Sequence, residues 1–307
     1  MREWRRKALV IGGYIAFGLA AFLFSLYLTL PMDAVAQRLA HELNKGTGGG
    51  YSVELDGLST YWFSGLEAEA VSINRRSTSG EQGPIRLDGA YARLQLLPLL
   101  WLSTVIDAGV RLGDGEIEAS LWPESEGVFA FKVNAQDVNL MRPPVVPQLI
   151  GMPVGGVLAL KGSSKLNRGK RADSEVKLNL HLKNAALGPG SIQGFTLPRI
   201  NLGSLQAVVM MENGKLALRA FEQEGGDLAI DPSLNIAVRP RLSSSRLDAC
   251  IKLKPDPAFL EKEPKMKTVA QLAEVQLRKD DDEYFHVPLR GTLGRPRQRR
   301  RALCRSR

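Results

Sequence analysis

The sequence predicts a mainly β protein: a single N-terminal transmembrane helix followed by an antiparallel β-rich domain, either a sandwich or an open groove, with a few short helices. The helix is predicted by residues 8–30, a segment of 23 residues without a charged side chain. About 20 apolar residues suffice to cross about 30 Å of hydrocarbon. The β domain is predicted from residue 51 onward, where short runs of alternating apolar and polar residues are separated by turn residues.

The membrane orientation follows from the charges in front of the apolar segment. Arg2, Arg5, Arg6 and Lys7 face a single acid there, Glu3. Because basic residues favour the cytoplasmic side, we expect residues 31–307 on the opposite side of the membrane. A cleaved signal peptide is the alternative, since residues 34–36 form a small-x-small triplet. The apolar core of a signal peptide is shorter, however, at about 7–15 residues.

The formal net charge of +9 is concentrated at the two ends of the chain. Residues 295–307 contain seven arginines and no acid, and the first seven residues contribute +3, which leaves −1 for residues 8–294. A balanced body gives no electrostatic reason to expect nucleic-acid binding. Cys250 and Cys304 are far apart, and Cys304 lies in the basic tail, so no structural disulfide is expected.

These patterns divide the chain into five regions. They are a basic cytoplasmic N-terminus (1–7), a transmembrane anchor (8–30), a juxtamembrane helix with a glycine linker (31–50), a β-rich domain (51–294) and an arginine-rich disordered tail (295–307).

The clearest strand covers residues 176–182, where apolar and polar residues alternate without interruption. Such a strand has one buried and one solvated face. Several strands of this kind build either a packed core or an apolar groove. The side chains expected to line it are Val176, Leu178, Leu180, Leu182, Leu216, Leu218, Leu228 and Ile230. The aromatic cluster at residues 61–63 is expected in the core, with a membrane-interface position as the alternative.

No constellation of catalytic or metal-binding residues is predicted. His41, His181 and His286 lie in three separate contexts, and none has a second ligand at metal-binding spacing. The acidic run at residues 280–283 lacks the spaced carboxylates and glycine of a calcium loop, so it is interpreted as a solvated turn. We therefore expect a protein that is not an enzyme and has no cofactor.

Three segments resemble type II secretion system protein N: residues 194–203 (GFTLPRINLG), 213–216 (NGKL) and 224–228 (EGGDL). The N-terminal apolar segment and residues 61–65 fit the same family. Residues 288–293 (PLRGTL) are similar to the end of the AsmA-like group of membrane-anchored proteins. The resemblance implies a single-pass protein of the inner membrane with a periplasmic β domain. It implies no catalytic residues.

Three functions follow as hypotheses. The first is an accessory of type II secretion that acts through contacts with other secretion components and has a closed interior. The second is an AsmA-like protein that binds or transfers lipid, with phospholipid in an apolar groove. The third is an enzyme acting on envelope polymers, which would need a cleft with converging carboxylates.

Overall fold

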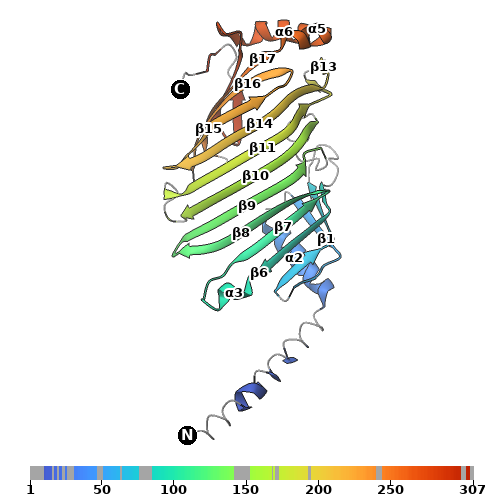
Figure 1. Cartoon of the computed structure of the whole chain (residues 1–307), viewed down its shortest axis with the longest axis vertical. Coiled ribbons are helices and arrows are strands. Elements are labelled where there is room, and N and C mark those ends of the chain that lie inside the picture. Colours follow the sequence, from blue (N-terminus) through green and yellow to red (C-terminus); the bar gives the residue numbers. More distant parts are fainter. Residues whose placement is uncertain are drawn as a thin grey trace.

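The computed structural model describes residues 10–15, 17, 18, 21, 22, 25, 31–46, 51–62, 64–75, 85–141, 153–167, 169, 173–192, 195–239, 244–298 and 302–304. Most of them belong to one 15-stranded sheet whose neighbouring strands are all antiparallel (Figure 1). The other described strands form a second sheet of three strands and a two-stranded hairpin.

The elements follow the chain as a meander. The small sheet consists of β1 (Tyr51–Asp56), β4 (Ala70–Arg75) and β5 (Ile85–Leu87), and the hairpin of β12 (Gly190–Ile192) and β13 (Phe195–Leu197). The large sheet has the order β18 (Arg278–Lys279), β19 (Phe285–Thr292), β17 (Arg246–Pro255), β16 (Leu228–Ala237), β15 (Lys215–Glu224), β14 (Ile200–Glu212), β11 (Glu175–Leu187), β10 (Val154–Asn167), β9 (Val128–Asn139), β8 (Gly115–Ser125), β7 (Ile106–Leu112), β6 (Gly89–Leu94), β3 (Gly65–Ala68) and β2 (Ser59–Tyr61), with β20 (Arg295–Gln298) beside β19. The described helices outside the N-terminal segment are α2 (Met32–Gly46), α3 (Leu96–Leu99), α5 (Pro257–Lys262) and α6 (Pro264–Gln276).

Local turn chemistry explains the meander. Between β14 and β15, for example, Glu212 pairs with Lys215, and the two residues between them are Asn213 (φ 51°) and Gly214 (φ 70°). Two successive residues with positive φ match the twist of a tight hairpin, and Asn-Gly is the pair that adopts this conformation at the lowest cost.

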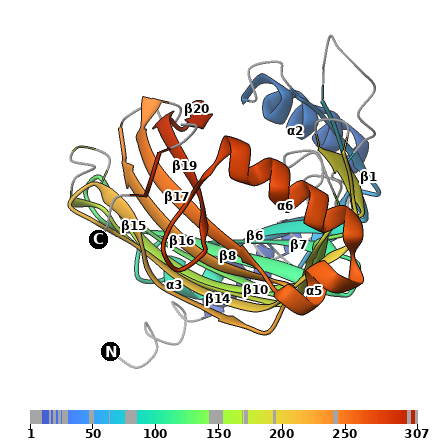
Figure 2. The ribbon, with the colours of Figure 1, turned by 90° about the horizontal axis from the view of Figure 1, so that it is seen from above.

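A row of β-bulges bends the large sheet. Register shifts occur where β10 pairs with β9 and with β11, and where β11 pairs with β14. Asp137 (φ 51°), Gly156 (φ 134°), Asn184 (φ 51°) and Gly203 (φ 72°) lie at these shifts. An extra residue on one strand bends that strand and increases its twist. Because these bulges lie near the same end of successive strands, the sheet curls into the trough seen in Figure 2.

The hydrophobic core lies where other elements cover the concave face of the trough. At one end, Phe259 of α5 and Met266 of α6 pack in a cluster with Leu182, Leu205 and Leu228. Towards the other end, Leu87 of the small sheet packs against a cluster built on Leu112, Ala135 and Val138. Figure 2 shows α6 lying across the open side of the curved sheet.

The predicted anchor at residues 8–30 lies mostly outside the described residues. Those of its residues that are described are helical and exposed, as at Tyr14 (73%) and Phe17 (73%). Within the described part of the chain, none of the helices combines the length and apolar character that crossing a bilayer requires. The helix expected after the anchor is α2, whose Asn44 Oδ1 accepts a hydrogen bond from the backbone N–H of Val53 (2.5 Å).

Candidate apolar groove and its surroundings

One face of the large sheet is apolar across most of its strands. Directly opposed residues of antiparallel strands project to the same face, so the strand register traces it from pair to pair. One such row, from β7 to β15, consists of Val110, Ile117, Ala135, Leu160, Leu180, Ala207 and Phe221. A parallel row consists of Ala108, Ala119, Val133, Gly162, Leu178, Val209 and Leu218. We call this surface, together with its continuation on β16, the apolar face.

The opposite face is polar over β8–β11, whereas on β14 and β15 it carries Val208, Met210 and Ala220. We call it the polar face. Glu118, Asn134, Lys161 and Asn179 form a cross-strand row there, and all but the half-buried Asn134 are exposed. Since the helices α5 and α6 pack on the apolar face, the apolar face is the concave side of the trough and the polar face is its outer side.

All eight side chains predicted to line a core or groove lie on the apolar face, and all are half-buried. They fall into two groups. Leu182, Leu228 and Ile230 pack against the cluster that includes α5 and α6. The other five lie outside both hydrophobic clusters, on the part of the face between them: Val176, Leu178, Leu180, Leu216 and Leu218.

Exposure on the apolar face increases along β7–β10. Near the bulges the face is covered, with Leu112 at 7% exposure and Val138 at 3%. At the other end of these strands Ile106 is 41%, Leu121 37% and Leu166 43% exposed. The concave face is therefore closed along one edge and open to solvent along the other, which describes a groove rather than a sandwich interior.

The sequence pattern did not predict which side chains at this open edge lie on the apolar face. In residues 128–133 two phenylalanines alternate with other apolar residues, so the pattern indicates a strand but does not identify the inward face. The register assigns it: Phe129 and Phe131 lie opposite Pro123 and Leu121 on the apolar face.

The side chain of Gln223 bridges β15 and β16 where these two strands separate. β15 and β16 pair only at residues 215–217 and then separate. Gln223 lies opposite Leu205 on the apolar face. Its Nε2 donates to the carbonyls of Leu202 (2.9 Å) and Leu228 (2.8 Å), while its Oε1 accepts from the N–H of Ile230 (2.7 Å). Gln223 thus satisfies backbone groups that the separated strands leave unpaired.

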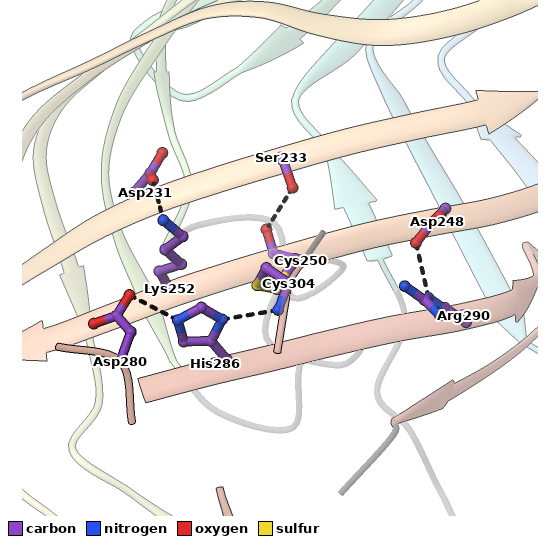
Figure 3. The surroundings of a disulfide bond; sticks show 9 residues. All are labelled: Asp231, Ser233, Asp248, Cys250, Lys252, Asp280, His286, Arg290 and Cys304. Carbon is purple, nitrogen blue, oxygen red and sulfur yellow. Dashed lines mark hydrogen bonds and ion pairs between the residues drawn. A yellow bond between two sulfur atoms is a disulfide. The ribbon is translucent and has the colours of Figure 1, made fainter. Parts of the chain in front are cut away.

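The expectation of no disulfide was wrong. Cys250 of β17 and Cys304 are bonded, with their Cα atoms 5.8 Å apart (Figure 3). The expectation of a disordered tail also fails for its described residues. β20 pairs with β19, and the segment at residues 302–304 lies against the sheet through the disulfide. Sequence separation alone gave no indication of this pairing.

His286 is buried (4% exposed) beside the disulfide. Its Nδ1 accepts the backbone N–H of Cys304, so its Nε2 carries the ring proton and donates to Asp280 Oδ2; both contacts are 2.8 Å long (Figure 3). This hydrogen bond is the main reason why the pKa of Asp280 is below its ordinary value. The acidic turn therefore contains one structural carboxylate.

Cys250, His286 and Cys304 offer potential metal-ligand atoms within 4.8 Å of one another. Because the two sulfur atoms are bonded to each other and both ring nitrogens are in hydrogen bonds, none of the three offers a free ligand atom in this arrangement. The other two histidines lie elsewhere: His41 is exposed on α2, and His181 Nε2 lies 3.1 Å from Ser204 Oγ.

The aromatic cluster at residues 61–63 is divided. Tyr61 is half-buried and stacks on Tyr91, with ring centroids 4.8 Å apart. Trp62 is 67% exposed, so its expected core position was wrong. Phe63 lies outside the described residues.

The fold and the apolar groove define a class of protein, a curved antiparallel sheet with an apolar concave face. Comparison of the chain with protein-family models, with curated proteins and with solved structures gives no match for it.

Proposed function

We propose that the protein binds the acyl chains of membrane lipids in the apolar groove, as a lipid-binding or lipid-transfer protein of the AsmA-like kind. The observation that carries the proposal is the apolar face itself: continuous over many strands, half-buried along its middle and open along one edge. Large contiguous apolar surfaces on proteins generally serve binding.

The dimensions of the groove suit an acyl chain. Neighbouring strands lie about 4.8 Å apart, so the row from Val110 to Phe221 spans about 29 Å. One lipid leaflet occupies roughly half of a hydrocarbon layer about 30 Å thick. Each buried CH₂ group contributes about 0.8 kcal/mol, so a partly covered chain would still bind appreciably.

The proposed location is the inner membrane, with residues 8–30 as a single-pass anchor and the β domain in the periplasm. The basic cluster Arg2, Arg5, Arg6 and Lys7 supports this orientation. The disulfide between Cys250 and Cys304 supports an oxidising compartment such as the periplasm.

The test is photo-crosslinking of the full chain in its membrane. A photoreactive residue at Leu178 faces the groove, while the same residue at Lys177, its neighbour in sequence, is exposed on the polar face. We expect a lipid adduct at position 178 and none at position 177. Equal adducts at both positions, or none at 178, would contradict the proposal.

A role in type II secretion through protein contacts is the second candidate. It is supported by the two ends of the large sheet, where β2 and the β18/β20 side are edge strands. Edge strands offer unpaired backbone groups to another polypeptide. A photoreactive residue at Ser59 of β2 tests it: an adduct with another secretion component supports this role, and exclusively lipid adducts at position 178 favour the first.

A further inference from the structure

An exposed apolar segment projects from one end of the sheet, between β6 and β7. Leu97 is 72%, Leu100 75%, Trp101 75% and Leu102 97% exposed. No charged residue occurs between Arg93 and Asp107. Isolated exposed apolar side chains are ordinary, but a run of this kind marks an interaction site. We call residues 96–102 together with Trp62 the apolar tip.

Trp62 is assigned to the tip through the pairing of Ser64, which lies two residues further along the chain. Ser64 Oγ donates to the carbonyl of Leu94 (2.5 Å), and the N–H of Leu94 donates to the carbonyl of Ser64 (3.2 Å). These bonds hold the turn that carries Trp62 beside the start of the tip. Tryptophan is enriched at membrane–water interfaces, where its ring and its N–H meet different surroundings.

The C-terminal half of the tip has its backbone N–H groups paired within the protein. The N–H groups of Leu100, Trp101 and Leu102 donate to the carbonyls three residues earlier, at 3.0–3.1 Å. Ser103 closes the turn onto the carbonyl of Pro98, and Gln95 donates to Val105 at its base. Backbone groups that enter a bilayer need partners within the protein, and the tip meets this condition over these residues.

Leu102 has a φ of 56°, in the left-handed region that a leucine rarely adopts. The bonds from Leu102 to Leu99 and from Ser103 to Pro98 form the Schellman pattern that ends a helix, and this pattern requires a left-handed residue at position 102. Glycine usually occupies this position, whereas here an almost fully exposed leucine does.

The position of the tip in the fold indicates the kind of partner that it contacts. Figure 1 shows α3 and α2 at the same end of the sheet, opposite α5 and α6. The chain enters this end through α2, directly after the uncharged residues 8–30. The tip is also continuous with the groove, since Leu94 (38% exposed) and Ile106 (41%) flank it on the apolar face.

We propose that the apolar tip inserts into the interface of the lipid bilayer and places the open edge of the groove against the membrane. The inference rests on the proposed membrane function and adds the surface through which lipid would enter. A bilayer fits a surface of this kind because the tip offers apolar side chains, two tryptophans and no charge.

The experiment uses the full chain in phosphatidylcholine vesicles with and without bromine on the acyl chains. The protein has four tryptophans, so W4F/W62F/W122F leaves only Trp101. The matched control W4F/W62F/W101F leaves only Trp122, which lies on the polar face with Lys132 Nζ 5.4 Å from its ring centroid. Bromine quenches tryptophan at short range, so we expect at least several-fold stronger quenching of Trp101 than of Trp122.

Equal quenching of the two variants would overturn the proposal. If a triple variant fails to fold, W101F and W122F alone give the same comparison through the quenchable signal that each removes. The groove is tested separately by the adduct at position 178. If Trp101 is quenched but no lipid adduct forms at position 178, the proposal for the tip stands and the lipid-binding groove is contradicted. If the adduct forms but Trp101 is not quenched, the groove stands and the proposal for the tip is contradicted.

Discussion

Asp107 connects three strands on the polar face of the sheet. It is 9% exposed and accepts hydrogen bonds from Gln95 (2.9 and 3.0 Å), Arg93 (3.1 Å) and Ser120 (2.8 Å). Burial opposes its ionisation, but these hydrogen bonds and the Arg93 charge outweigh burial and hold the pKa of Asp107 below its ordinary 3.8. A lowered folded-state pKa contributes stability above the ordinary value, and this contribution is lost as the pH falls through the lower one.

We predict that D107N removes this contribution. At about pH 7 the variant should lose about 1–3 kcal/mol, because hydrogen bonds to a charged group are replaced by weaker ones. As the pH falls from about 5 to about 2, wild type should lose more stability than D107N. Urea unfolding at several pH values measures both. The control is D248N, whose half-exposed pair with Arg290 should contribute less than about 1 kcal/mol. Identical pH profiles for wild type and D107N would contradict the assignment.

The alternation pattern of the sequence does not predict the role of Gln223. A glutamine at this position only interrupts the apolar face of a strand. We predict that Q223A costs roughly 2–4 kcal/mol, because it leaves two carbonyls and one N–H without the partner that Gln223 supplies. Q206A, an exposed glutamine on the polar face of β14, should stay within about 0.5 kcal/mol. Chemical unfolding measures the free energy of unfolding of both variants. Similar losses of stability would show that the backbone groups bonded by Gln223 find other partners.

At the scale of elements, the alternation of residues 176–182 correctly predicted a strand with one apolar face. One strand contains a residue that strands ordinarily exclude, since β16 runs unbroken through Pro232. Proline lacks an N–H and is excluded from fully paired strands. It is tolerated here because the described pairing of β16 with β15 is confined to residues 235–237, so no β15 residue pairs with Pro232. This limited pairing depends on tertiary structure and leaves no local signal.

The C-terminal segment was also outside the reach of sequence patterns. β20 is a short run rich in arginine, a composition typical of disorder, and is held by pairing with β19 and by the disulfide. Composition predicts how the segment behaves in isolation. In the folded chain, pairing with β19 and the bond to Cys250 of β17 hold it in a defined conformation.

We predict that reducing agent destabilises the wild-type chain. Cys250 and Cys304 are 54 residues apart, and closing a loop of this length is worth roughly 4 kcal/mol in the unfolded-chain account. The expected result is a lower unfolding temperature for wild type in reducing agent and no effect of the reducing agent on C250S/C304S. An equal effect on both proteins would show that the bond does not stabilise the native chain.

At the scale of the whole molecule, the mainly β fold was predictable, but the choice between sandwich and groove was not. The choice depends on curvature, which the bulges at Asp137 and Asn184 help to set. Aspartate and asparagine tolerate positive φ but occur widely in turns and polar loops, so their presence does not identify a bulge. The covering elements α5, α6 and β5 then leave part of the apolar face open, and no local pattern specifies how much they cover.

The last prediction concerns that open part. Ser164 and Ser163 are neighbours on β10, and Ser164 pairs with Phe131 and Val176 on the apolar face while Ser163 is exposed on the polar face. In S164F the ring should occupy space in the groove between β9 and β11 and compete with an acyl chain. The same ring in S163F should lie outside the groove. Full-length proteins extracted from membranes under identical conditions and analysed by mass spectrometry give the phospholipid bound per chain.

We expect about one or more phospholipids on wild type and S163F, and several-fold less on S164F. The direction follows from apolar area: a phenylalanine ring in the groove replaces contacts that each contribute about 0.8 kcal/mol per CH₂ group of the lipid. Unfolding curves in the same detergent separate loss of lipid from loss of fold. Lipid-free wild type would count against the groove as a lipid site, and equal lipid on all three proteins would place the lipid on the anchor or the outer surface. A loss confined to S164F, with its fold intact, would locate the acyl chain on the apolar face between β9 and β11.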